Sequence, residues 1–429
     1  MLNITFCSYP DYSGNARALY EYMKKIYKKF NYVWVVKEDN IYNQLKKDGV
    51  EVVKEKSDEM LNKIKTTDVL FTTHANLTEY KVQNSNTLYI ELWHGVSPKC
   101  IGYLINDISA NDQIWLENIR KKIDYFIVPS KFWVPIFSSR FNILAKRVLP
   151  LGFPMFDNII KSNGVDNLKK ILNIDVTKYN KIIYYMPTVK SGTSRTEKIQ
   201  VNQQNIFNIQ EYEEQKLIDY LAKNNYLLCV KYHPSEKLKF NMIDSEYVKY
   251  IDEESLKRNN LDIYTILNAA DILITDYSSL GLLYLILERP VIYLANDLKD
   301  FNNTRGILFG NFKFWTENQI ATNIKSLIKK IDDNINNFDI EKIKEKKELL
   351  FGYLNDGGCE ELCKYFFTSD GLRKENIEYN FCLSSLLKDE NGKIKVENQE
   401  LREEIEKITS SKGYKIIERL RKVINKIRK

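Results

Sequence analysis

The chain contains only three histidines, and two of them stand in similar sequence surroundings. His94 follows an apolar run and precedes Gly95, while His233 follows a second apolar run in the other half of the chain. Histidine can act as a base near neutral pH, and as imidazolium it stabilises charge that builds up on a phosphate. A single loop histidine is usually structural. Two histidines at matching strand ends indicate a shared reaction centre.

A second group of polar residues follows the apolar run Ile272–Ile274. Thr275 and Asp276 interrupt this run, and Ser278 and Ser279 are good N-cap residues for the apolar stretch that comes next. A helix that starts after a strand presents free backbone N–H groups and a positive dipole end, which suits a phosphate. In open α/β sheets ligands also bind at the carboxyl ends of strands. The alternative is an ordinary capped turn between a strand and a helix.

Other groups could assist at the same point. His74 also follows a predicted strand but is the weaker histidine candidate. Three lysines could help to neutralise a phosphate, and the alternative for each is a solvated surface charge: Lys99, Lys190 and Lys231. The sequence has no P-loop, no G-x-G-x-x-G motif, no zinc-ligand spacing and no carboxylate pair spaced for Mg²⁺. We therefore expect phosphate chemistry without a metal or cofactor, carried by helix ends, hydroxyls and cations.

Strands alternate with helical stretches along most of the chain, which predicts a parallel sheet in each half. A lower-complexity connector, Lys161–Asn180, separates the halves, and the polar segment Lys190–Asn208 is a candidate mobile loop over the site. We expect an α/β fold in which two Rossmann-like domains face each other across a cleft. The predicted strands are Asn3–Ser8, Tyr32–Val36, Asp68–Thr73, Thr87–Leu92, Asp124–Val128, Arg147–Leu151, Lys181–Tyr185, Tyr226–Val230, Ile272–Ile274 and Val291–Leu294. Helical stretches at Glu341–Tyr353 and Cys359–Phe367 either close the second domain or cross back to the first.

The last part of the chain has a different character. Apolar residues at seven-residue spacing predict a short coiled coil that could support an oligomer: Leu387, Ile394, Leu401 and Ile408. The segment Tyr414–Lys429 predicts a basic amphipathic helix, which can lie on an anionic membrane surface. The alternative is a helix docked on the protein itself.

Composition sets the limits of these interpretations. The 429 residues suffice for two domains and a tail, and the net charge of +7 is too mild to require nucleic acid as a partner. The six cysteines are scattered, which is typical of reduced thiols in the cytoplasm. The sequence around Met1 lacks the features of a signal peptide, and no apolar run reaches the length of a membrane span. We expect a soluble or peripheral protein.

The assembled motifs, which span roughly residues 1–368, resemble the CDP-glycerol glycerophosphotransferase family, that is, the teichoic-acid and capsule polymerases and primases. The motifs that carry the resemblance are Tyr12-Ser-Gly-Asn15 with Ala18-Leu-Tyr20, Leu92-Trp-His-Gly95 with Pro98-Lys99, Gly152-Phe-Pro154 with Asp157, Pro187-Thr188, Lys231-Tyr-His-Pro234, Ile274-Thr-Asp-Tyr-Ser-Ser279, Arg305-Gly306 and Asp356-Gly357.

The resemblance implies a GT-B fold and a metal-independent transfer of polyol phosphate from a CDP-polyol such as CDP-glycerol to a hydroxyl acceptor, with release of CMP. His94 would be the general base, and His233 would bind the donor diphosphate or assist the leaving CMP. The donor side would comprise Lys231, Thr188, Thr275, Ser278, Ser279, Arg305 and Asp276, the last orienting its loop. The acceptor side would comprise Ser13, Asn15, Gly95 and Lys99. The acceptor would be a polymer or lipid-linked chain at the cytoplasmic face of the plasma membrane.

These implications divide the chain into an acceptor-side domain at 1–160, a CDP-donor domain at 161–370 and a helical tail at 371–429. Three departures from the family pattern leave the polyol and the acceptor open. Leu282-Leu283 stands where the family usually has Phe-Asp, and Met155 stands where it usually has arginine. The family also usually carries an arginine near the position of Lys190. Two alternatives to polyol-phosphate transfer stay open: a GT-B glycosyltransferase that uses a nucleotide sugar, and a non-catalytic scaffold of a polymer-synthesis complex.

Overall fold

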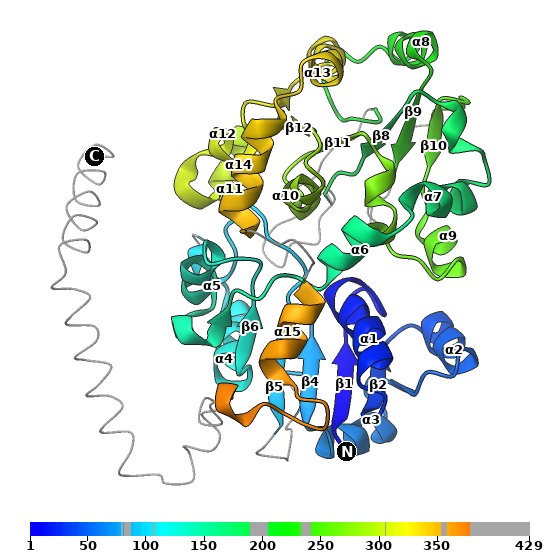
Figure 1. Cartoon of the computed structure of the whole chain (residues 1–429). Coiled ribbons are helices and arrows are strands. Elements are labelled where there is room, and N and C mark those ends of the chain that lie inside the picture. Colours follow the sequence, from blue (N-terminus) through cyan, green and yellow to red (C-terminus); the bar gives the residue numbers. More distant parts are fainter. Residues whose placement is uncertain are drawn as a thin grey trace, which may run out of the picture. The chain divides into compact units, whose positions relative to one another are not determined.

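The computed structural model describes residues 1–78, 80, 87–105, 108–188, 205–232, 242–304, 306–352 and 358–377. Met1–Glu378 form one compact unit that contains two parallel β-sheets, one from each half of this part of the chain (Figure 1). The predicted coiled coil and the segment Tyr414–Lys429 lie outside the described residues, and so does most of the polar segment 190–208.

The first sheet has seven parallel strands in the order β3-β2-β1-β4-β5-β6-β7. The order reverses between β1 and β4, so the carboxyl ends of these two strands form the switch point where ligands bind in open α/β sheets. The strands are short apolar runs because both faces of the sheet are covered. They are β1 Asn3–Cys7, β2 Asn31–Val36, β3 Val52–Lys54, β4 Val69–Thr72, β5 Leu88–Glu91, β6 Tyr125–Ile127 and β7 Val148–Leu149.

The second sheet repeats this topology with six parallel strands in the order β10-β9-β8-β11-β12-β13. Its order reverses between β8 and β11. The prediction of a parallel α/β sheet in each half is therefore confirmed, and the domain boundaries at residues 160 and 370 stay predictions. The strands are β8 Lys181–Tyr185, β9 Tyr226–Val230, β10 Val248–Tyr250, β11 Ile272–Thr275, β12 Val291–Leu294 and β13 Ile320–Ala321.

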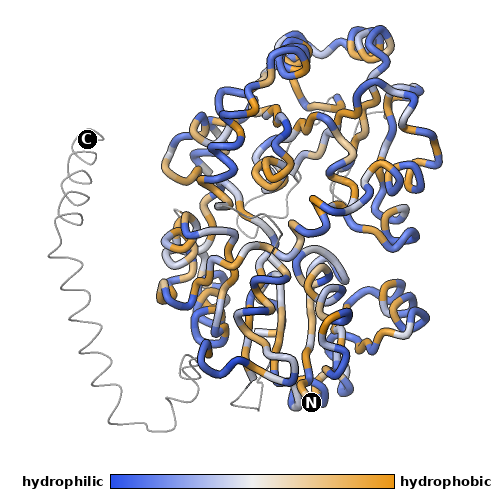
Figure 2. The backbone as a smooth tube through the Cα atoms, viewed as in Figure 1, coloured by the Kyte–Doolittle hydropathy of each residue, from blue (hydrophilic) through white to orange (hydrophobic). Residues whose placement is uncertain are grey.

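Helices connect the strands, and Figure 2 shows hydrophobic and hydrophilic residues alternating along them, as expected for helices that pack one face on a sheet. In the described part of the chain no helix is long and apolar enough to cross a bilayer. The α-helices are α1 Gly14–Ile26, α2 Asp39–Lys47, α3 Asp58–Lys65, α4 Ala110–Lys122, α5 Trp133–Phe141, α6 Met155–Lys161, α7 Gly164–Leu172, α8 Glu214–Asn224, α9 Glu253–Arg258, α10 Ser279–Leu283, α11 Leu298–Thr304, α12 Phe312–Thr316, α13 Ile324–Asn336, α14 Ile340–Phe351 and α15 Gly358–Phe366. Short 3₁₀ turns are η1 Gly102–Leu104, η2 Ala145–Arg147, η3 Val176–Lys178, η4 Ile263–Thr265, η5 Leu267–Ala269, η6 Tyr284–Leu287, η7 Leu308–Gly310 and η8 Lys374–Asn376.

The segment between the two sheets contains regular structure. Residues 161–180, which the sequence indicated as a lower-complexity connector between the halves, contain α7 and η3, and neither element was predicted. Helix α7 is capped by Asn163, whose side chain accepts a hydrogen bond from the Asp166 N–H at 3.3 Å, and it buries Leu168 and Ile171. These two apolar side chains form the buried face of the helix, and the polar residues between them leave the opposite face to solvent. The short strands β3, β10 and β13 were not predicted either, because two or three residues show no clear alternation.

Helix α15 crosses back to the first half of the chain, which decides between the two options left open by the sequence. In Figure 1 the orange α15 lies beside α1 and over the first sheet. The Phe367 ring, directly after α15, packs against Tyr27 and Phe30 with centroids 5.7 and 5.9 Å away. The Cys359 N–H also donates to the Asp157 carboxylate at 3.2 Å.

Candidate active site

His94 lies in the loop that follows β5, at the carboxyl edge of the first sheet, and is partly exposed. Its Nδ1 lies 2.9 Å from the Thr73 carbonyl oxygen, at the end of the neighbouring strand β4. A carbonyl oxygen only accepts hydrogen bonds, so Nδ1 carries the proton and Nε2 keeps its lone pair. This arrangement gives His94 the tautomer that a general base needs.

His74 lies directly beside His94. The two imidazole rings are stacked, with centroids 3.7 Å apart and planes inclined by 8°. His74 Nδ1 lies 3.1 Å from the hydroxyl of Thr73, the same residue whose carbonyl accepts from His94. The histidine that the sequence ranked third is therefore the one that the described residues bring to His94. The two histidines meet because β4 pairs with β5, and a single sequence does not reveal which strands are neighbours.

The surroundings of this pair keep both rings neutral near pH 7. Burial lowers the pKa of His94 to about 4, and the nearby positive charges of Arg140 and Lys99 act in the same direction, against the hydrogen bond to Thr73. Burial also lowers the pKa of His74, and His94 adds to this effect. A neutral imidazole can take a proton from a hydroxyl, so the geometry favours the role of base over that of imidazolium for His94.

Asn15 holds the His94 loop in place from helix α1. Its side chain is fully buried, and its amide nitrogen donates to the carbonyls of Leu92 and Trp93 at 3.0 and 2.9 Å. Its carbonyl oxygen accepts the Met155 N–H at 3.0 Å, which ties the same point to the start of α6. Asn15 was predicted on the acceptor side. The structure gives its side chain three partners within the fold, which set the position of the loop.

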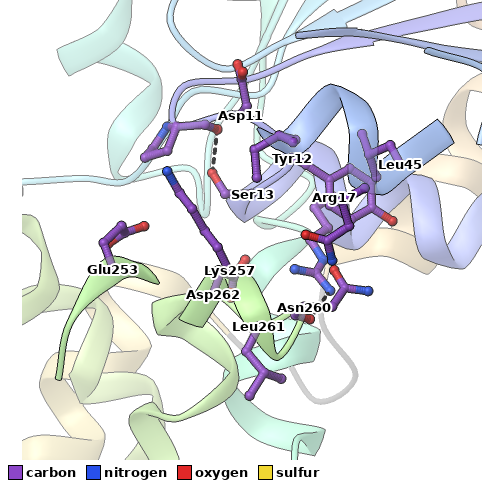
Figure 3. A pocket seen from close by; sticks show the side chains of 13 residues that line it. Asp11, Tyr12, Ser13, Arg17, Leu45, Glu253, Lys257, Asn260, Leu261 and Asp262 are labelled. Carbon is purple, nitrogen blue, oxygen red and sulfur yellow. Dashed lines mark hydrogen bonds between the residues drawn. The ribbon is translucent and has the colours of Figure 1, made fainter. Parts of the chain in front are cut away.

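Ser13 lies just before α1, where the two halves of the compact unit touch. Figure 3 shows its hydroxyl, which donates to the Pro10 carbonyl at 2.7 Å, beside a small cavity of about 30 Å³. Asp262 of the second half accepts the Gly14 N–H at 3.0 Å across this junction, and Arg17 donates to the Asn260 carbonyl at 2.7 Å. A cavity of this size has room for one or two water molecules but not for a nucleotide.

Gly95 brings the His94 loop against the start of α10. Its φ is +131°, a conformation that other residues rarely adopt. A Cβ atom at this position would lie 3.3 Å from Leu283 Cδ1 and 3.4 Å from Ser279 Cβ. The prediction placed the two motifs on opposite sides of one site, and the structure shows them in close approach.

The polar residues after β11 have different roles. Ser278 caps α10 by accepting the Leu280 N–H at 3.3 Å, and Ser279 is partly exposed beside Gly95. Thr275 is fully buried and donates to the Met186 carbonyl at 2.6 Å, so its hydroxyl ties β11 to the end of β8. Asp276 is also buried, and its carboxylate accepts hydrogen bonds from a residue in the loop that follows β8.

That residue is Thr188. Its backbone N–H and its hydroxyl donate to the two oxygens of the Asp276 carboxylate at 2.9 and 2.8 Å. The orienting role that the resemblance suggested for Asp276 therefore has a defined partner. Both residues lie at the switch point between β8 and β11, the position equivalent to that of His74 in the first sheet.

The predicted cations are tied into the structure in different ways. Lys231 directly follows β9 and forms an ion pair of 2.9 Å with Glu253 of α9. Lys99 pairs with Ile307 in a β-bridge between the two halves. His233, Arg305 and Lys190 lie outside the described residues, so the predicted meeting of His94 with His233 stays a prediction.

Comparison with known proteins agrees with this architecture. The chain is 28% identical over 295 residues to the teichoic acid glycerol-phosphate primase of Bacillus subtilis (strain 168), a match that covers 67% of this chain and 70% of the primase. It is 25% identical over 283 residues to the teichoic acid ribitol-phosphate polymerase TarL of Staphylococcus aureus (strain NCTC 8325 / PS 47), covering 65% of this chain and 48% of TarL. The chain thus spans about half the length of that polymerase.

A solved structure shares the fold. The wall teichoic acid polymerase TagF superposes with a TM-score of 0.67 at 23% sequence identity, over 84% of this chain and 87% of the TagF chain. The family model described as CDP-Glycerol:Poly(glycerophosphate) glycerophosphotransferase matches residues 2–367, which include both sheets and every site residue discussed above. The chain therefore belongs to the CDP-glycerol:poly(glycerophosphate) glycerophosphotransferase family.

Proposed function

We propose that this protein transfers glycerol phosphate, or a related polyol phosphate, from a CDP-activated donor to a hydroxyl of a growing cell-surface polymer and releases CMP. The observation that carries the proposal is the orientation of His94. Its Nδ1 proton is held by the Thr73 carbonyl, which leaves Nε2 as the basic nitrogen, and the next residue, Gly95, approaches Ser279 at the start of α10. Family membership supplies the class of donor.

The reaction is a single displacement at phosphorus. The acceptor oxygen attacks the β-phosphorus of the CDP-polyol, and its proton passes to Nε2 of His94. The bond between the β-phosphorus and the bridging oxygen breaks, and that oxygen leaves as part of CMP. Positioning and electrostatic stabilisation dominate such transfers, and we propose that no metal takes part.

The donor would lie against the second half of the chain. Ser278 and Ser279 would offer hydroxyls and N–H groups to the diphosphate, and the loop held by Asp276 and Thr188 would border it at the switch point. We keep His233, Lys231 and Arg305 in the donor site on the strength of the family motifs. Thr275 supports the site through the Met186 carbonyl, since its hydroxyl is buried.

The solved relatives support histidine chemistry and a CDP-type donor. TagF structures include a histidine-to-asparagine variant soaked with CDPG and a histidine-to-alanine variant. We infer the same GT-B arrangement for this chain, with two sheets facing across a cleft and a site that draws residues from both. On the acceptor side we keep Ser13, Asn15, Gly95 and Lys99, with Asn15 acting through the loop that it holds.

The proposal is tested by incubating the purified protein with a polymer or lipid-linked primer and a panel of CDP donors that includes CDP-glycerol and CDP-ribitol. We expect CMP release and extension of the primer by polyol phosphate. Mass spectrometry of the extended primer would identify the polyol. No CMP release across the panel would contradict the proposal. A thermal shift with UDP or GDP and none with CMP would favour the glycosyltransferase alternative. A protein that shows no turnover of its own, but supports polymer synthesis by its complex equally well after His94→Ala, would favour the scaffold.

We also propose a place for the protein at the cytoplasmic face of the plasma membrane. The support is the basic amphipathic pattern of Tyr414–Lys429 and the lipid-linked or polymeric acceptor that the family implies. The heptad pattern at residues 387–408 would allow the chain to form an oligomer.

A further inference from the structure

A carboxyl group lies buried beneath the two stacked histidines. Glu91 is the last residue of β5 and has no exposed surface. It is paired across the sheet with Thr72, the last residue of β4, so it lies at the carboxyl edge from which both histidine loops start. No family motif on which the resemblance rests includes it.

The Glu91 carboxylate accepts hydrogen bonds from both loops. Its Oε1 accepts the Trp93 N–H at 2.8 Å, one residue before His94. Its Oε2 accepts the Ala75 N–H at 2.7 Å, one residue after His74. The Thr72 hydroxyl donates to the same Oε2 at 2.5 Å. One side chain thus joins the backbones on either side of the histidine pair.

The two backbone donors have unusual conformations. Trp93 and Ala75 have φ angles of +55° and +51°, in the left-handed region that non-glycine residues rarely adopt. In each turn the N–H donates to the carboxylate, and the residue next to it in sequence carries one of the two imidazoles. Conformations of this kind persist only where surrounding contacts stabilise them. The hydrogen bonds to Glu91 stabilise both loops at once.

We propose that Glu91 is a positioning residue of the transfer reaction, which fixes the stacked register of His74 and His94 by clamping the two loops that carry them. This inference rests on the proposed function for its kinetic consequence, but its structural part does not. Glutamine cannot fully replace the clamp, because an amide has one accepting oxygen where the carboxylate has two. Burial raises the pKa of Glu91 to about 7, against the three hydrogen bonds that favour its ionised form.

The test is Glu91→Gln, followed by two measurements. With only three histidines in the chain, ¹⁵N-histidine NMR reports each ring separately. We expect the ring signals of His74 and His94 to shift and broaden as the stack loosens. In the transfer assay we expect kcat to fall roughly 10- to 100-fold, the loss typical of a misplaced catalytic group, while KM for CDP-glycerol stays within about threefold.

A matched control separates positioning from general damage. Asp124 is another buried carboxylate that accepts a backbone N–H, from Tyr89 at 2.8 Å, but it lies at the opposite end of β5. Asp124→Asn should lower stability without moving the His74 and His94 signals or kcat. Thr72→Val removes one of the donors to Glu91 and keeps the shape of the threonine side chain. It should shift the histidine signals and lower kcat as Glu91→Gln does, but by smaller amounts. This variant provides the test if Glu91→Gln does not fold.

Two results would overturn the proposal. Histidine signals that match those of the parent protein in both Glu91→Gln and Thr72→Val would show that the carboxylate does not set the stack. An unchanged kcat in a folded Glu91→Gln protein would show that the register does not matter. If the parent protein itself releases no CMP from any donor, the proposed function fails, and the NMR comparison still decides the role of Glu91.

Discussion

The imidazole rings of His74 and His94 lie face to face, 3.7 Å apart between centroids, on two loops that leave neighbouring strands of the first sheet. Thr73 binds both rings, one through its carbonyl and the other through its hydroxyl. The site therefore presents a pair of oriented neutral histidines instead of a single base. This relationship makes the contributions of the two rings separable by substitution.

Replacing His94 by Ala should reduce kcat by about 10²- to 10⁴-fold, the usual contribution of a positioned general base. Replacing His74 by Ala removes a stacking partner worth about 0.5–1.5 kcal/mol, so kcat should fall roughly threefold to tenfold. His74→Phe keeps an aromatic face without the ring nitrogens and should recover most of this loss. The measurement is CMP release at saturating donor. Equal losses in both alanine variants would contradict the assignment of His94 as the base.

The low pKa of His94 makes a prediction about pH. The neutral ring should persist down to about pH 4, so an NMR titration should show no His94 transition near 6.5. The groups that face it are His74, Lys99 and Arg140, and replacing Arg140 by Met should raise the pKa of His94 because a nearby positive charge is lost. A kinetic transition near pH 7 would belong to another group, such as Glu91.

The same pKa has a consequence for stability. The unfolded chain takes up the His94 proton near its ordinary value of 6.5, while the folded protein resists it until about pH 4. The contribution of this group to the free energy of unfolding is therefore lost as the pH falls from 6.5 toward 4. The free energy of unfolding, measured by urea titration of the parent protein and of His94→Gln between pH 6.5 and 4, would show this contribution. An equal loss of stability in both proteins would mean that a group other than His94 causes the pH dependence.

Gly95→Ala should impair transfer through geometry alone. The backbone at φ +131° strains a side chain, and the new Cβ would press on Leu283 and Ser279. We expect kcat/KM for the donor to fall about tenfold or more, since the loop and the start of α10 would have to separate. Gly49→Ala is a suitable control, because Gly49 also has a positive φ, of +71°, but nothing lies within 4 Å of the added atom. Similar losses of activity in both variants would point to backbone strain alone.

The alternation of strand-like and helical stretches along the sequence was sufficient to predict a parallel sheet in each half, apart from the short strands β3, β10 and β13. The strands around His94 and the run at Ile272 were predicted within one or two residues, because buried parallel strands read as continuous apolar runs. The approach of Gly95 to Ser279 was expected only in outline. It depends on how two halves of the chain pack, which is a long-range property without a local signal.

The parts that were missed concern neighbours across a sheet. His74 was ranked third because the sequence does not say that β4 lies beside β5. Glu91 lies inside the predicted strand Thr87–Leu92, and a carboxylate in an apolar run is a signal in itself, because a buried charge needs partners. Thr275 was expected to contact phosphate, but its hydroxyl is taken up by the Met186 carbonyl.

The predicted terminal helix provides the last test. Deleting Tyr414–Lys429 removes seven lysines and arginines together with an apolar stripe, and each basic residue near an anionic surface contributes about 1 kcal/mol. Co-sedimentation with phosphatidylglycerol vesicles should therefore drop sharply, while CMP release with a soluble acceptor should be unchanged. A full-length variant with these basic residues replaced by Gln separates the two contributions, since it keeps the apolar stripe. It should bind anionic vesicles more weakly at low salt and respond less to added salt than the parent protein. Vesicle binding that survives the deletion would assign membrane attachment to another part of the chain.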